Sequence, residues 1–225
     1  MVSRIIKFYF FGDSIFFGQH VSPHLTWVVK ISEFLAKAGE DLGIEVVIQN
    51  PSVSGNTTRL ALERIEYDAL SHRPDILSIQ FGLNDCNIWK TSNGISRIPP
   101  MSFESNLHEI IQRAVLMGVK MIILFTNHPT TRDGVDMDGV DYSFEQNNRR
   151  YNEILRKVAQ VHSNVTLVDI EQDMLCKSEG IEGCLNEYLL DDKLHLSSKG
   201  HEFYFQQTNS ILLKILKTVV NQEIQ

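Results

Sequence analysis

The decisive stretch of this sequence reads IIKFYFFGDS, from Ile5 to Ser14. Its residues up to Phe11 are apolar apart from one lysine, a pattern that indicates a buried strand. Gly12 and Asp13 then end the strand. Open α/β sheets bind ligands at the carboxyl ends of their strands, so Ser14 stands where such a sheet places its chemistry. Taken alone, the same residues are also typical of a turn or a helix cap.

The rest of the chain alternates short apolar runs with longer segments of helical period. Such alternation predicts an α/β fold, in which right-handed βαβ units build a parallel sheet with helices on both faces. The expected strands are Ile5–Phe11, Glu45–Gln49, Ile76–Phe81, Lys120–Phe125 and Val165–Val168. The expected helices are Leu25–Leu42, Thr58–Leu70, Phe103–Met117, Phe144–His162 and Lys199–Val219.

Local signals support several of these boundaries. Gly43 and Gly118 follow the first and third helices as left-handed terminators. Ser143, with Gln146 three residues later, forms a capping-box pattern before the fourth helix. No repeat, low-complexity tract or linker divides the sequence, so we expect one domain over residues 1–225.

The composition argues against several classes of function. A formal net charge of −7 disfavours a nucleic-acid or anionic-membrane partner. No apolar stretch approaches the roughly 18 residues of a membrane span, and the run after Lys7 is too short for a signal peptide. We read Cys86, Cys176 and Cys184 as free thiols, with a Cys176–Cys184 disulfide as the alternative. These features predict a cytoplasmic protein; nothing in the sequence indicates an oligomeric state.

Three segments without apolar periodicity are candidates for functional loops, because long loops in a compact domain usually carry function. The first two follow strands and should therefore lie at the same sheet edge as Ser14. The segments are Gly82–Ser102, Asn127–Tyr142 and Glu179–Ser197.

The last of these segments contains a candidate general base. A serine hydroxyl is a weak nucleophile at neutral pH and needs a base within hydrogen-bond reach. Among the eight histidines, His195 stands out because Asp192 lies three residues before it. A carboxylate at this spacing can bend back to the imidazole and orient it. Asp191 is the alternative acid, and the spacing favours Asp192.

Acyl transfer also needs hydrogen-bond donors for the oxyanion that develops in the transition state. Gly55, within Ser54-Gly55-Asn56 after the second strand, lets the backbone approach a substrate closely. Asn84, after the third strand, carries a side-chain amide that can reach into the site. Each of these two segments is equally consistent with a plain glycine turn.

Taken in order, four blocks resemble those of the SGNH (GDSL-type) hydrolase superfamily, over nearly the whole chain from Phe11 to Gly200. The blocks are Phe11-Gly12-Asp13-Ser14, Ser54-Gly55-Asn56-Thr57-Thr58, Gly82-x-Asn84-Asp85 and Asp192-x-x-His195. The resemblance implies a flavodoxin-like three-layer α/β/α sandwich with a five-stranded parallel sheet.

The resemblance also implies roles for the residues that match. Ser14 would attack an acyl carbonyl, His195 would act as base and then acid, and Asp192 would orient His195. The oxyanion hole would consist of the Ser14 and Gly55 backbone N–H groups and the Asn84 side chain. This predicts a serine esterase without a cofactor, acting with water on a small to medium acyl ester. Related enzymes take carbohydrate O-acetyl esters, aryl esters, thioesters and lysophospholipids.

Two alternatives stay open. The same triad could transfer the acyl group to an alcohol instead of water. From a different class, a flavodoxin-like module could bind a nucleotide or flavin, although the chain lacks Gly-x-Gly-x-x-Gly and Gly-x-x-x-x-Gly-Lys-Ser/Thr. An α/β-hydrolase is disfavoured because Ser14 is followed by Ile15 and Phe16, which breaks the pattern Gly-x-Ser-x-Gly.

Further residues near the blocks have two interpretations each. Phe16, Phe17, Ile88 and Trp89 would either line an acyl pocket or pack in the core. His128, after the fourth strand, would either contact substrate or serve as ordinary loop polarity.

We expect no metal. His20 and His24 have helical spacing, but Ser22 and Pro23 interrupt it and no third ligand follows. The segment Asp136–Gly139 fits a calcium loop only in part.

Overall fold

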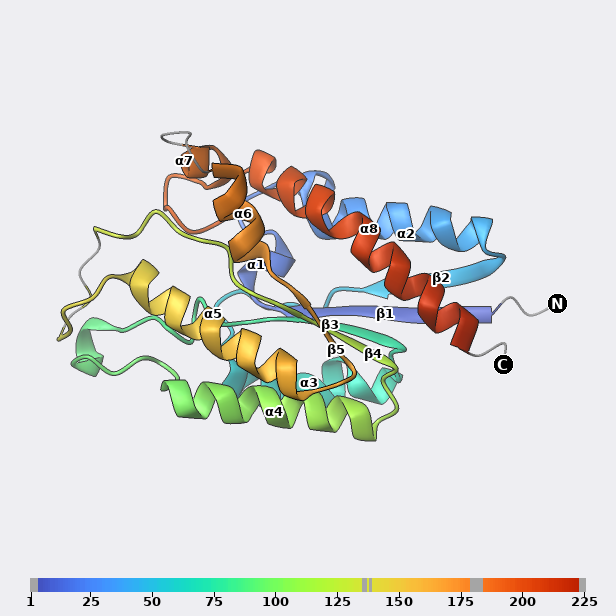
Figure 1. Cartoon of the computed structure of the whole chain (residues 1–225), viewed down its shortest axis with the longest axis horizontal. Helices are drawn as coiled ribbons and strands as arrows, with labels where there is room; N and C mark the ends of the chain where they lie inside the picture. Colours follow the sequence, from blue (N-terminus) through green and yellow to red (C-terminus); the bar gives the residue numbers. More distant parts are fainter. Residues whose placement is uncertain (1–3, 135–136, 138, 179–183, 223–225) are drawn as a thin grey trace.

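The computed structural model describes residues 4–134, 137, 139–178 and 184–222. Its strands are β1 (Arg4–Gly12), β2 (Ile44–Gln49), β3 (Ile76–Gln80), β4 (Met121–Phe125) and β5 (Val165–Val168). They form one parallel sheet in the order β2-β1-β3-β4-β5 (Figure 1). This order is flavodoxin-like, and it confirms the expected α/β fold.

Helices cover both faces of the sheet, which completes the three-layer sandwich (Figure 1). On one face lie α1 (Ser14–Phe17), α2 (Trp27–Asp41), α6 (Ile170–Ser178), α7 (Cys184–Tyr188) and α8 (Ser198–Gln222). On the other face lie α3 (Thr58–Asp68), α4 (Pro100–Leu116) and α5 (Phe144–Val161). The 3₁₀ turns are η1 (Pro23–Leu25), η2 (Leu70–His72) and η3 (Lys90–Ser92). Within the described residues, no helix is both long and apolar enough to cross a membrane.

The core is built around β1, which pairs with β2 on one side and β3 on the other. A central parallel strand is covered on both faces and therefore needs apolar side chains in both directions. Phe10 meets the Trp27 ring edge-on at 5.4 Å on one face, and Phe11 meets Phe81 at 5.5 Å. Burial of each such ring contributes about 1.5–3 kcal/mol. The strand ends at Gly12, where a Cβ would lie 2.9 Å from the Gln80 carbonyl oxygen.

Most boundaries match the expectation, and the differences have local causes. The first long helix begins at Trp27 because Pro23–Leu25 forms a 3₁₀ turn. The third begins at Pro100, since proline is well suited to the first helical position. The capping box of Ser143 and Gln146 is present with both hydrogen bonds. α6 and α7 were not expected, and α7 lies in a segment expected to be a loop.

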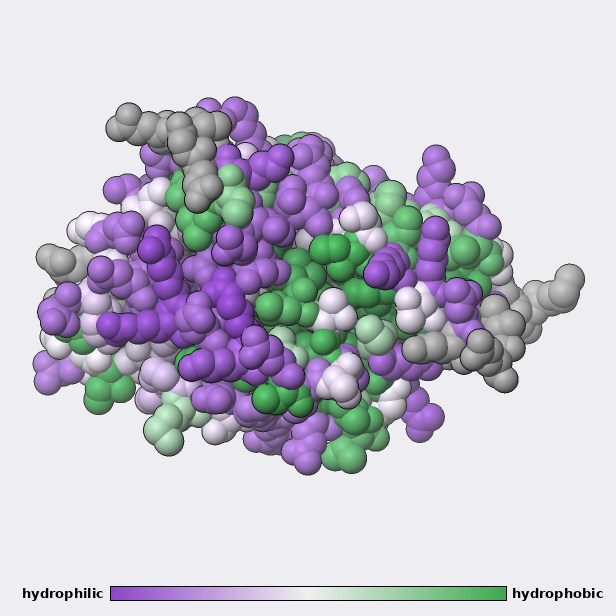
Figure 2. Space-filling view, in the orientation of Figure 1, coloured by the Kyte–Doolittle hydropathy of each residue, from purple (hydrophilic) through white to green (hydrophobic). Residues whose placement is uncertain are grey.

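All five strands end at the same edge of the sheet. Connections on either side of β1 leave toward opposite faces, and ligands bind in such sheets at this switch point. In the space-filling view, the most hydrophilic side chains of this face gather toward the end of the molecule where the strands terminate (Figure 2). The carboxyl edge beside β1 and β3 is therefore where a functional site is expected.

Candidate active site

Ser14 is held in a sharp turn at the carboxyl end of β1. It is the first residue of the four-residue helix α1, and it is only 5% exposed. Asp13 caps this helix, since its Oδ1 accepts a hydrogen bond from the Ile15 amide at 3.0 Å. Gly18 ends the helix with φ 80° and donates its N–H to the Ser14 carbonyl. The turn fixes the direction in which the Ser14 hydroxyl points.

His195 joins Ser14 to Asp192. Its Nε2 lies 3.0 Å from the Ser14 Oγ, and its Nδ1 lies 2.5 Å from the Asp192 Oδ2. Because a carboxylate only accepts hydrogen bonds, Nδ1 carries the proton and Nε2 can accept from the serine hydroxyl. The other Asp192 oxygen accepts the backbone N–H groups of Leu194 and His195, both at 2.9 Å. The Asp-x-x-His spacing thus closes a tight turn in which Lys193 has φ 63°.

Asp192 supplies the carboxylate that contacts His195. Partial burial disfavours its charged form, but hydrogen bonds from the His195 ring and from the two backbone amides outweigh that effect and lower the pKa of Asp192 to about 2. The carboxylate is therefore ionised at any pH at which esters are assayed. The neighbouring Asp191 is the alternative that the sequence left open. Both aspartates are exposed, but it is the Asp192 Oδ2 that contacts the His195 ring.

A segment that follows β4 holds the loop carrying Asp192 and His195. It runs from His128 to Arg132 and donates hydrogen bonds to three successive carbonyls of that loop. The pairs are His128 Nε2 to the Leu194 oxygen (2.8 Å), the Thr131 amide to the Lys193 oxygen (3.3 Å), and Arg132 Nε and Nη2 to the Asp192 oxygen (3.0 and 2.9 Å). We call this segment the β4 brace. It fixes the backbone from which His195 projects.

His128 is part of the β4 brace and does not reach a substrate. Its side chain is fully buried, and its Nδ1 lies 2.7 Å from the Tyr204 hydroxyl of α8. Burial lowers the pKa of His128 to about 4, so the ring is neutral and one nitrogen accepts while the other donates. Of the two interpretations from the sequence, substrate contact is therefore wrong, and the residue's polarity serves the loop.

The residues expected to form the oxyanion hole are linked to the turn that carries Ser14 and to each other. Asn84 donates one N–H of its Nδ2 to the Asp13 Oδ2 at 3.2 Å, which leaves the second N–H for a ligand. Gly55 has φ 78° with open space where a Cβ would stand, so backbone conformation, rather than crowding, calls for glycine there. Arg97 links the two, because it donates to the Asn84 Oδ1 (3.3 Å) and to the Gly55 carbonyl (3.1 Å).

Two buried carboxyl groups, Asp13 and Asp85, support these blocks. Burial raises the pKa of Asp13 to about 7, helped by the nearby Asp85, and raises the pKa of Asp85 to about 6. Asp85 accepts from both the amide and the hydroxyl of Thr58, at 2.8 and 2.5 Å. This contact ties the start of α3 to the loop that carries Asn84.

Arg64 braces the first two blocks from α3. Its guanidinium donates to the Asn56 Oδ1 (2.6 Å), the Pro51 carbonyl (2.6 Å) and the Gly12 carbonyl (3.2 Å). It also lies 4.3 Å from the centre of the Phe11 ring. Arg64 and Arg97 are the supporting residues that sequence reasoning missed. Neither belongs to a motif. No local pattern predicts their contacts with Gly12 and Gly55, which lie 52 and 42 positions away in the sequence.

The four residues with two interpretations, acyl pocket or core packing, separate into two groups. Phe16 is fully buried against Trp27 and Phe125, which supports core packing for it, and Ile88 is also buried. Phe17 and Trp89 are exposed, at 56% and 54%. Trp89 lines a cavity of about 490 Å³ together with Arg97.

The helical spacing of His20 and His24 is not realised, because His20 has φ 69° and lies before the 3₁₀ turn η1. Instead, the His20 ring packs edge-on against His195, with ring centres 5.2 Å apart. Within the described residues, one group has metal-ligand geometry: atoms of His20, Asp192 and His195 lie within 4.8 Å of one another. Two acidic residues of the partial calcium loop, Asp136 and Asp138, lie outside the described residues.

Two of the three cysteines can be placed. Cys86 is buried and Cys176 is exposed, and both are free. The side chain of Cys184 lies outside the described residues.

The model of the GDSL-like Lipase/Acylhydrolase family matches residues 10–203. An acetylxylan esterase of Geobacillus stearothermophilus is 27% identical over 215 residues, which cover 87% of this chain and 88% of that protein. An arylesterase of Vibrio mimicus is 28% identical over 113 residues, 50% of each protein. The crystal structure of a lipase/acylhydrolase from Enterococcus faecalis has a TM-score of 0.71 at 24% identity, covering 93% of this chain and 96% of its own; it shows a shared fold.

Proposed function

This chain belongs to the GDSL-like lipase/acylhydrolase family and is an esterase, and we propose that it hydrolyses small to medium acyl esters through an acyl-enzyme on Ser14. One observation supports the proposal above the others. It is the hydrogen-bonded series in which 2.5 Å separates Asp192 from His195 and 3.0 Å separates His195 from Ser14. A serine in such a series can lose its proton to the histidine as it attacks.

The proposed reaction has two halves. The Ser14 Oγ attacks the acyl carbon while its proton passes to the His195 Nε2, and the ionised Asp192 stabilises the resulting imidazolium. The tetrahedral intermediate collapses, and His195 gives the proton to the departing alcohol. Water then attacks the acyl-enzyme with His195 as base, which releases the acid and restores Ser14.

The oxyanion of each tetrahedral intermediate would accept hydrogen bonds from three donors. These are the backbone N–H groups of Ser14 and Gly55 and the free N–H of Asn84. Loss of one donor of this kind typically lowers turnover about 10²–10³-fold. The contacts of Asn84 with Asp13 and Arg97 hold its amide in place, so little reorganisation is needed when charge develops.

The names of the relatives favour carbohydrate O-acetyl esters and aryl esters within the wider range of substrates that the sequence predicts. Thioesters and lysophospholipids complete that range. Transfer to an alcohol would use the same acyl-enzyme and differs only in the second nucleophile. We also propose a cytoplasmic location, which the free thiols of Cys86 and Cys176 support.

The test is the hydrolysis of p-nitrophenyl acetate and butyrate by the wild type and by Ser14→Ala. We expect the substitution to lower kcat about 10³-fold or more, because the nucleophile is lost. Ser54→Ala, at an exposed serine of the second block, is the matched control and should keep wild-type activity. A fluorophosphonate probe should label Ser14. Retention of full activity by Ser14→Ala, or a label on another serine, would overturn the mechanism.

A further inference from the structure

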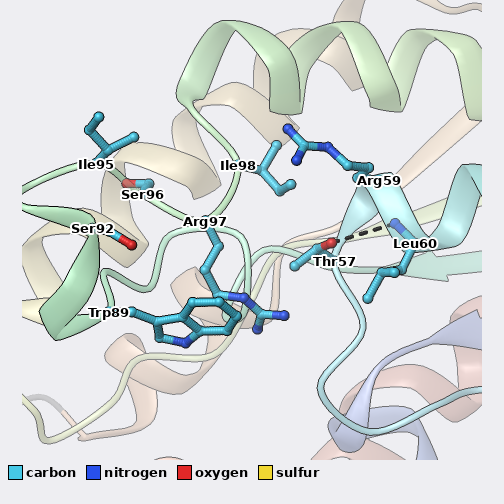
Figure 3. A pocket seen from close by; sticks show the side chains of 9 residues that line it. All are labelled: Thr57, Arg59, Leu60, Trp89, Ser92, Ile95, Ser96, Arg97 and Ile98. Atoms are coloured by element: carbon cyan, nitrogen blue, oxygen red, sulfur yellow. Dashed lines mark hydrogen bonds between the residues drawn. The ribbon is translucent and has the colours of Figure 1, made fainter.

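A cavity of about 490 Å³ opens beside the proposed oxyanion hole, between the start of α3 and the segment that follows β3 (Figure 3). Its size is in the range of small-molecule sites. In Figure 3, Trp89 and Arg97 form one wall, and Arg59 and Leu60 of α3 stand across from them. None of Ser14, Asp192 and His195 lines it, so it can bind a substrate but cannot react with it.

Arg97 connects this cavity to the reacting centre. The same guanidinium that lines the cavity donates to the Asn84 Oδ1 and to the Gly55 carbonyl. Thr57, which also lines it, is two residues from Gly55. An ester whose carbonyl oxygen reaches Asn84 and Gly55 would therefore extend its remote part toward the cavity.

The wall containing Trp89 is fixed before any ligand binds. Ile88 and Ser96 form an antiparallel bridge, so residues 88–96 make a hairpin. Asn147 of α5 donates to the Cys86 carbonyl at 2.6 Å and to the Ser96 Oγ at 3.2 Å, which fastens both sides of the hairpin. A preformed wall reduces the entropy that a ligand must lose on binding.

The cavity combines exposed apolar surface with positive charge. Trp89, Ile95 and Leu60 are 54%, 62% and 38% exposed, and exposed apolar side chains that gather at a hollow mark a binding surface. Arg97 stacks on the Trp89 indole at 4.7 Å. The charged residues of the lining are Arg59 and Arg97, without a carboxylate, in a chain of net charge −7.

Arg59 is the cation that can serve a ligand. Arg97 already donates to two protein acceptors, whereas in the described part of the chain no hydrogen bond or ion pair engages the exposed guanidinium of Arg59. A guanidinium matches the geometry of a carboxylate, to which it can donate two parallel hydrogen bonds. We propose that the cavity is a subsite for the remote part of the ester, and that it selects a flat or apolar group carrying a carboxylate, held against Trp89 and paired with Arg59.

This inference rests on the proposed esterase function, and its test uses two aryl acetates of nearly equal shape. One is 4-acetoxybenzoate, which carries the carboxylate, and the other is the neutral 4-acetoxybenzamide. We expect Arg59→Gln to lower kcat/KM for the benzoate about tenfold more than for the benzamide, mainly through KM, because a charge-assisted hydrogen bond is lost. Differences in the leaving groups cancel when the two ratios are compared.

Two further variants complete the design. Arg73→Gln removes an exposed positive charge outside the cavity and should leave the ratio of the two esters unchanged. Trp89→Ala should raise KM for both esters, about fivefold, because the aromatic wall serves both. If Arg59→Gln affects both esters equally, or neither, the subsite is wrong while the esterase stands. If the wild type hydrolyses neither ester nor p-nitrophenyl acetate, the proposed function fails and the subsite fails with it.

Discussion

Asp191 and Asp192 are neighbours in the sequence, yet only Asp192 has its carboxylate against the His195 ring. Asp192→Asn should lower kcat for p-nitrophenyl acetate by about 10²–10⁴-fold, because an amide in place of the carboxylate favours the wrong tautomer of His195. Asp191→Asn should stay within about twofold of the wild type, since an exposed charge contributes little. The test is a comparison of kcat for the two variants by steady-state kinetics. A larger loss of kcat in Asp191→Asn than in Asp192→Asn would assign the acid to Asp191.

His20 places a second imidazole beside His195, the proposed general base, so that a metal ion could bind both rings. Its ring stands edge-on to His195, and a ligand atom from each of His20, His195 and Asp192 falls within 4.8 Å of the other two. Imidazole and carboxylate are good ligands for Zn²⁺. A metal ion bound here would occupy His195 and prevent it from accepting the Ser14 proton.

We therefore expect added Zn²⁺ to inhibit ester hydrolysis and EDTA to restore it. His20→Asn should raise the Zn²⁺ concentration for half inhibition about tenfold, because one ligand is lost. Asparagine tolerates the left-handed conformation that His20 adopts, with φ 69°. His24→Asn, at an exposed histidine in η1, is the matched control and should leave inhibition unchanged. Equal inhibition of wild type and His20→Asn would place the metal elsewhere.

At the scale of residues, the sequence predicts the contacts that depend on short spacings and on the ends of strands. Ser14, Asn84 and Gly55 follow strand ends, and Asp192 reaches His195 within one turn, so motif and topology were enough to bring them together. Arg97 was not predicted because the Gly55 carbonyl to which it donates lies 42 positions earlier in the sequence. Such contacts depend on the path of the folded backbone.

At the scale of elements, the β4 brace is the feature that positions the loop before α8. The bonds from Arg132 to the Asp192 carbonyl are charge-assisted and lie directly behind the acid. Arg132→Met keeps the length of the side chain but removes both bonds. We expect kcat to fall about tenfold with KM nearly unchanged, because a loss of about 1.4 kcal/mol in transition-state stabilisation corresponds to that factor.

Arg150→Met is the matched control for this prediction. Both arginines lie over an aromatic ring: Arg150 is 4.1 Å from the centre of the Tyr142 ring, and Arg132 is 5.2 Å from the centre of the Phe144 ring. The hydrogen bonds to the Asp192 carbonyl come from Arg132 alone among the described residues. If both variants lose activity equally, the effect comes from the aromatic contact or the charge, and the β4 brace has no positioning role.

The limits of prediction at this scale have physical causes. α6 and α7 are short, and α6 follows β5 almost directly, so neither displays a long apolar period. Long helices such as α5 were found because a cap and several turns of periodic residues agree. The strand β1 was found because seven consecutive positions carry almost entirely apolar side chains.

For the whole molecule, alternation of strands and helices predicts a parallel sheet but does not by itself give the strand order. The order β2-β1-β3 places the ends of β1, β2 and β3 next to one another, and these ends carry Ser14, Gly55 and Asn84. The family resemblance implied a flavodoxin-like sandwich with a five-stranded parallel sheet, and the observed strand order is the one typical of that fold. The same convergence buries Asp13 and Asp85 behind the site, which has a consequence for the stability of the entire fold.

Asp13 makes the stability of the molecule depend on pH in an unusual direction. Burial raises the pKa of Asp13 to about 7, whereas an Asp in an unfolded chain ionises near 3.9. Between these values the folded state keeps a proton that the unfolded state has lost, so the free energy of unfolding falls as pH rises from about 4 to about 7. Asp85, with its pKa raised to about 6, acts in the same direction.

Asp13→Asn removes one of the two groups that keep a proton in the folded state. The free energy of unfolding of this variant, taken relative to that of the wild type, should therefore increase between pH 4 and pH 7 and level off above pH 7. The slope cannot exceed about 1.4 kcal/mol per pH unit, the value for one proton. Urea unfolding of the variant and of the wild type at pH 4.5, 6 and 8 measures this difference in the free energy of unfolding. Asp191→Asn, at an exposed position, should show no such trend. A difference between Asp13→Asn and wild type that stays constant or shrinks as pH rises would mean that Asp13 is ionised in the fold, and that its bonds from Ile15 and Asn84 outweigh the cost of burial.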